Sequence, residues 1–76
     1  MIKELDTIVL TKDLPEHHLS KGDVGAVVMV YNNGEAYEVE FVTLNGETIA
    51  VETINATFIR AVNNKDVMHV RELTTV

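Results

Sequence analysis

The chain has 76 residues and no cysteine, which predicts one small domain without disulfides or thiolate-bound zinc. Twelve acidic residues against six basic ones give a formal net charge of -6, which disfavours binding to phosphate backbones. The apolar fraction of 46% is ordinary for a globular protein, and no apolar run approaches the ~20 residues of a membrane span. We therefore expect a cytoplasmic protein that binds neither nucleic acid nor membranes.

Short runs of β-forming residues predict five strands, at residues 7–10, 25–31, 36–43, 48–53 and 60–62. A long connection over residues 11–22 contains the only proline, Pro15. Asn55 is placed to cap one helical turn at residues 55–59, immediately before the last strand.

Two glycine turns predict how the central strands pair. Asn33 and Gly34 form a two-residue hairpin signal. This hairpin would place Val30 opposite Tyr37, Val28 opposite Val39, and Ala26 opposite Phe41 on one apolar face.

For the next hairpin we expect a three-residue loop, residues 44–46, with Gly46 left-handed in a bulge. This loop pairs Phe41 with Ile49 and Val39 with Val51, and it sends Glu52 outward. A two-residue loop would instead turn Glu52 to the inner face, where an unpartnered carboxylate is costly.

These registers predict an apolar inner face and a small barrel. The inner residues are Ala26, Val28, Val30, Tyr37, Val39, Phe41, Ile49 and Val51, with Ile8, Leu10, Phe58 and Ile59 closing the core. The fold class is all-β, a small SH3-like five-stranded antiparallel barrel with a helical turn before its last strand. An OB-like barrel is the alternative, although the chain is short for it. The barrel domain would span residues 1–62, and residues 63–76 would form an extension, either an extra strand or a tail.

Four segments together resemble a known family: "TKDLPEH", "KGDVGAVVMVY", "AYEVEFVTLNGETIAVET" and "IRAV". They are similar to DUF4926, a family of small bacterial proteins of unknown function, over roughly residues 2 to 62. The resemblance implies an SH3-like fold and no established catalytic residues or cofactor. It also implies pairing with another small bacterial protein, as in toxin–antitoxin or immunity modules. His18 stands where the family pattern favours glycine.

The segment "KGDVGAVVMV" also resembles the KOW motif of RNA-associated barrels, with Gly22 and Gly25 at the turn into the second strand. KOW loops bring Lys and Arg to RNA, whereas here Lys21 sits beside Asp23 and the next strands carry Glu35, Glu38 and Glu40. The motif therefore predicts barrel geometry. A KOW-like nucleic-acid-binding barrel is the alternative function, and it would require a basic patch built from Lys12, Lys21 and Arg60.

The sequence gives little support for a metal site or an enzyme active site. His17 and His18 are adjacent and would point apart, so they make a poor metal site with Asp13 or Glu16. Asp13, Glu16 and Asp23 lack the cleft that paired catalytic carboxylates need, and Ser20 lacks a nucleophile elbow. We expect no enzyme, no metal and no cofactor. The glycines Gly22, Gly25, Gly34 and Gly46 are interpreted as structural turn residues.

The outer face of the sheet is the candidate protein interface. The same registers place Val27, Met29, Tyr31 and Val42 there, flanked by Glu38, Glu40 and Glu52. Aromatic and Met side chains beside a charged rim are typical of interfaces. Either the tail covers this face, through Val67, Met68 and Val70, or another protein chain or a second copy does. A further alternative is that strong strand curvature turns some of these residues into the barrel. The sequence thus predicts a non-enzymatic protein-binding module.

Overall fold

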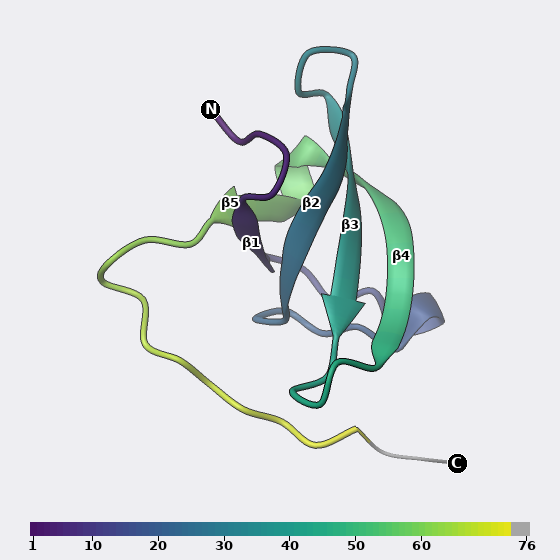
Figure 1. The fold of residues 1–76 in the computed structure, drawn as a ribbon, viewed down its shortest axis with the longest axis vertical. Coiled ribbons are helices and arrows are strands. Elements are labelled where there is room, and N and C mark those ends of the chain that lie inside the picture. Colours follow the sequence, from purple (N-terminus) through teal and green to yellow (C-terminus); the bar gives the residue numbers. More distant parts are fainter. Residues whose placement is uncertain (74–76) are drawn as a thin grey trace.

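The computed structural model describes residues 1–73, which form five strands and two short 3-10 turns (Figure 1). The strands are β1 (Thr7–Leu10), β2 (Val24–Tyr31), β3 (Ala36–Val42), β4 (Thr48–Asn55) and β5 (Ile59–Ala61). The turn η1 (Pro15–His17) lies between β1 and β2, and η2 (Ala56–Phe58) precedes β5. The side chain of Asn55 caps η2 by accepting a hydrogen bond from the Thr57 N–H at 2.9 Å.

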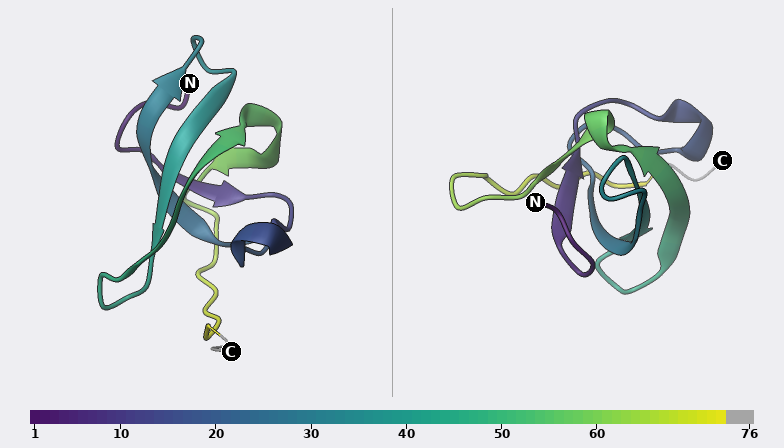
Figure 2. Two further views of the ribbon diagram at one scale, coloured as in Figure 1. Left: turned by 90° about the vertical axis from the view of Figure 1, so that its right-hand side faces the viewer. Right: turned by 90° about the horizontal axis from the view of Figure 1, so that it is seen from above.

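The strands form one antiparallel sheet in the order β4-β3-β2-β1-β5. The long strands β2, β3 and β4 make a meander, and the short strands β1 and β5 cross one end of it (Figure 2). Within the described residues, β4 and β5 are not paired, so the sheet curls without closing. The all-β class, the five antiparallel strands and the turn before the last strand are confirmed. No helix in the described part of the chain is long and apolar enough to cross a membrane.

The first hairpin turns through three left-handed residues. Asn32, Asn33 and Gly34 have φ of 50°, 58° and 103°. The Tyr31 carbonyl accepts hydrogen bonds from the N–H groups of Gly34 and Glu35, at 3.0 and 3.1 Å. The turn thus begins one residue earlier than expected. The predicted pairing of Val30 with Tyr37 is nevertheless present.

An irregularity in β2 then changes the register. Val28 has no partner in β3, and Val27 takes its place opposite Val39. Val27 is 0% exposed, whereas Val28 is 39% exposed and Ala26 is also exposed. The outward assignment of Val27 and the inward assignments of Ala26 and Val28 were therefore wrong. One extra residue reverses the alternation of side chains from that point onward.

The second hairpin has the predicted loop. The Thr43 N–H donates to the Glu47 carbonyl at 2.8 Å, and the Gly46 N–H donates to the Thr43 carbonyl at 2.9 Å. Gly46 has a φ of 88°, in the left-handed region. Residues 44–46 therefore form the expected three-residue loop.

Beyond this loop, β4 has its own irregularity. Val42 pairs with Thr48, but Phe41 pairs with Ala50, which leaves Ile49 without a partner. The rest of β4 is shifted by one residue, so Val51 is 47% exposed and Glu52 lies opposite Val39. The predicted inward Val51 and outward Glu52 were wrong. The Glu52 carboxylate nevertheless has a partner and some contact with water, because it lies partly exposed, 3.2 Å from Nδ1 of His17 in η1.

The core contains residues from every strand and from the long connection. Its buried members are Ile8, Leu10, Leu19, Val27, Tyr37, Val39, Phe41, Ile54 and Ile59. Phe58 is half-buried against them. Leu19 was not expected there; it is held by two backbone hydrogen bonds with Leu14, at 2.9 and 3.1 Å. His18 has a φ of 60°, a conformation that glycine adopts most easily.

The four glycines have different roles. Gly22, Gly34 and Gly46 all have positive φ and lie in turns, as predicted. Gly25 does not, and its assignment as a turn residue was wrong. It is buried inside β2, where a Cβ would lie 2.6 Å from Cγ1 of Val39.

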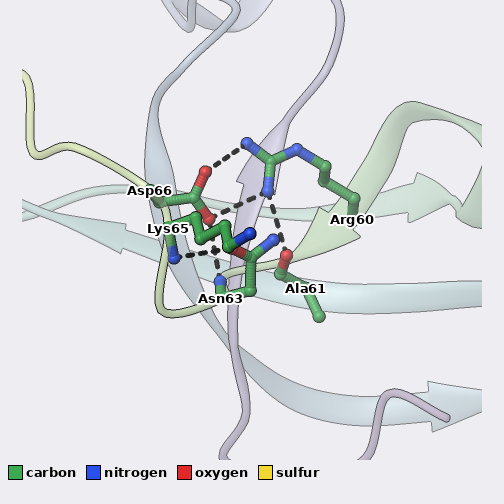
Figure 3. Close-up of polar contacts among 5 residues, drawn as sticks. All are labelled: Arg60, Ala61, Asn63, Lys65 and Asp66. Carbon is green, nitrogen blue, oxygen red and sulfur yellow. Dashed lines mark hydrogen bonds and ion pairs between the residues drawn. The ribbon is translucent and has the colours of Figure 1, made fainter.

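The C-terminal segment contains no strand or helix in residues 62–73. Two bidentate Arg–Asp ion pairs anchor it. Arg60 of β5 contacts both carboxylate oxygens of Asp66, at 3.0 and 2.7 Å (Figure 3). Arg71 contacts both oxygens of Asp23, at 2.8 and 2.6 Å. We call residues 66–71, which run from one anchored residue to the other, the strap. The part of the predicted extension in residues 74–76 lies outside the described residues.

The two ion pairs lower the pKa of both aspartate carboxyl groups. Hydrogen bonds from Arg60 and from the Asn63 N–H lower the pKa of Asp66 from its ordinary value of 3.8 to about 2. Burial alone would raise the pKa of Asp23, but hydrogen bonds from Arg71 and the Ser20 N–H outweigh it and lower the pKa. Both aspartates are therefore held in their charged forms.

Candidate protein-binding surface

The outer face of β2, β3 and β4 retains most of the predicted interface. Met29 of β2, Val42 of β3 and Val51 of β4 are 44%, 48% and 47% exposed. Glu38 lies opposite Met29, and Glu40 lies opposite Val51. Apolar and acidic side chains thus alternate across three strands. Val27, which was expected here, is in the core instead.

The polar side chains on this face are fixed by hydroxyl groups. The Tyr31 hydroxyl donates to Oε1 of Glu38 at 2.8 Å, and the Thr48 hydroxyl donates to Oε2 of Glu40 at 2.9 Å. The bond to Glu38 raises the pKa of Tyr31. Within residues 1–73, the three ion pairs found involve other acids. Neither Glu38 nor Glu40 is thus part of an ion pair in this described part of the chain.

A shallow depression lies at one end of this face. Thr7, Val24, Gly25, Ala26, Glu40 and Val42 line it, from three neighbouring strands. Its lining is mainly apolar, and Val24 is 53% exposed. Sequence reasoning missed Val24 and Val51, because both fall on this face only once the two register irregularities are known.

The carboxylates of the long connection have structural roles. Oδ1 of Asp13 accepts a hydrogen bond from the Lys21 N–H at 2.7 Å. Oδ2 of Asp23 accepts one from the Ser20 N–H at 2.9 Å, in addition to the Arg71 pair. In the part of the chain that the structure describes, no three His or acidic side chains are grouped to hold a metal ion.

The comparison with family models places this fold in a family. The model described as a domain of unknown function, DUF4926, matches residues 4–61. The chain belongs to the DUF4926 family. This match confirms the resemblance inferred from the sequence, and it covers all five strands but not the strap. No curated protein and no solved structure matches the chain.

The three cations of the alternative nucleic-acid surface are differently placed in this DUF4926 chain. Arg60 is paired with Asp66. The Nζ of Lys12 lies 4.5 Å from the centroid of the Phe58 ring, a cation–π geometry. Lys21 is exposed in the turn before β2. One of the three charges is thus already neutralised by its own chain.

Proposed function

We propose that this chain is a non-enzymatic module that binds another protein through the outer face of β2, β3 and β4. One observation carries the proposal: Met29, Val42 and Val51 stay about half-exposed on the sheet, beside carboxylates that accept hydrogen bonds from hydroxyl groups. Covering such apolar area contributes roughly 25 cal/mol per Å² removed from water. Side chains already held in place lose little entropy on binding.

The strap does not remove this area from water. Its apolar side chains, Val67, Met68 and Val70, are 91%, 89% and 73% exposed. They therefore do not pack on Met29 or Val42 in the monomer. Of the two covers considered from the sequence, a second protein chain is the one that this arrangement favours.

The finer proposal concerns the biological setting. A small acidic domain with a preformed apolar and acidic face suits the role of an antitoxin-like or immunity-like partner of a neighbouring bacterial protein. Such a role requires only tight binding in the cytoplasm and no chemistry. The net charge of -6 favours a partner that is basic at its binding surface.

The test is an affinity capture from the native host with matched variants. We expect wild-type protein to retain a stoichiometric partner, and Met29→Glu or Val42→Glu to lose it while circular dichroism shows an unchanged fold. Val62→Glu is the control, because Val62 is 40% exposed but lies beyond β5. Retention of the same partner by both face variants would refute the proposal.

A further inference from the structure

Between its two anchored ends, the strap has no backbone partner in the described part of its own chain. Within residues 1–73, the backbone of residues 67–70 forms no hydrogen bond. Its three large apolar side chains are largely exposed. Free backbone groups together with exposed apolar side chains are the features by which a peptide adds to a sheet edge.

The chain also carries an open edge of matching length. β4 lies at the end of the sheet, where it pairs with β3 on one side and with no other strand of the described chain. It is eight residues long, whereas the opposite edge strand, β5, has only three. An open edge of this length readily accepts another strand.

In its own molecule the strap is not paired with this edge while both anchors hold. One anchor is Arg60 of β5, and the other is Asp23, just before β2. β5 and β4 are at opposite ends of the sheet. Figure 1 shows the chain leaving β5 on the side away from β4. The complementary edge is therefore that of a second molecule.

The charges of the two segments agree with such pairing. The strap contains one acid, Asp66, and one cation, Arg71, and so has no net formal charge. Residues 47–55 contain Glu47 and Glu52 and no cation. Strap against β4 thus brings no like net charges together, whereas β4 against β4 would oppose two acidic segments.

We propose that the strap of one molecule adds as an extra strand to β4 of a second copy. Reciprocal addition uses both edges and gives a closed two-fold dimer. The proposal does not rest on the outer-face function, since it concerns the edge of the sheet and a different partner.

Sedimentation equilibrium of the full chain tests the dimer. Wild type is expected to dimerise, and Met68→Pro to raise the dimer dissociation constant at least about tenfold, because proline removes an N–H from the added strand. Leu44→Pro is the matched control: Leu44 is 95% exposed in the loop before β4, and its dimer should match wild type. A monomeric wild type, or a Met68→Pro protein that dimerises normally, overturns the proposal.

Cross-linking tests the pairing itself. Because the chain has no native cysteine, a disulfide can form only between the introduced positions. One chain carries Val51→Cys, and a second carries Val67→Cys, Met68→Cys or Val70→Cys. We expect a mixed disulfide between the two chains for at least one strap position, because neighbouring strands bring Cα atoms within disulfide reach. Cross-links formed only between two Val51→Cys chains would show β4–β4 pairing and refute the strap.

Discussion

Gly25 of β2 lies directly against the side chain of Val39 in β3. A Cβ at Gly25 would lie 2.6 Å from Cγ1 of Val39, and also 2.9 Å from the Glu40 carbonyl oxygen and from Cε1 of Phe41. Val39 and Phe41 are buried, and the carbonyl is part of the backbone. None of these atoms can move aside without disturbing the core.

Gly25→Ala should therefore destabilise the fold by about 1–3 kcal/mol, the usual cost of overpacking a core. Urea denaturation measures this change. Ala26→Val is the control: Ala26 is the next residue of β2, is exposed, and should change the free energy of unfolding by less than about 0.5 kcal/mol. Equal midpoints for Gly25→Ala and wild type would show that the two strands are farther apart.

Gly46 provides a test of backbone strain alone. Its φ is 88°, and a Cβ there would meet nothing within 4 Å. Gly46→Val should cost at least about 1 kcal/mol, because a β-branched residue is strained in the left-handed region. Gly46→Asn should cost less, because Asn tolerates this conformation. Thermal melts of the two variants decide the matter, and identical melting of Gly46→Val and wild type would exclude the bulged loop.

The anchor at Asp66 should open in acid. Its pKa is lowered from 3.8 to about 2 by Arg60 and the Asn63 N–H. A lowered folded-state pKa means that the stabilisation is fully present above pH 4 and is lost as the pH falls towards 2. Carboxyl carbon NMR should show Asp66 titrating near pH 2, and nearer its ordinary value in Arg60→Gln. Titration of wild-type Asp66 near 3.8 would mean that the pair is not formed in solution.

We expect no binding of single- or double-stranded RNA or DNA at physiological salt. The net charge is -6, and both Arg60 and Arg71 are paired within the chain, so little counterion release is available to drive binding. Fluorescence anisotropy with labelled oligonucleotides measures this, with a basic RNA-binding domain as the positive control. Salt-dependent binding at micromolar protein would restore the KOW-like alternative.

Local sequence signals determined the strands and turns. Runs of β-forming residues located all five strands. Gly34, Gly46 and Asn55 identified the two hairpins and the cap of η2. These features depend on near neighbours, because a left-handed turn or a cap is decided within a few residues. Met29, Tyr31, Val42, Glu38 and Glu40 were correctly assigned to the outer face for the same reason, since they lie where strict alternation holds.

Only the tertiary structure decided on which face of the sheet the side chains lie beyond the two irregularities at Val28 and Ile49. Bending the sheet to bury a small core inserts one unpaired residue in β2 and one in β4. Each insertion exchanges the two faces of its strand. As a result, Val27 is buried in the core and Val51 is exposed, each on the face opposite to the one predicted. The Arg71–Asp23 pair, formed across 48 residues, likewise depends on how the whole chain folds back, which no local pattern encodes.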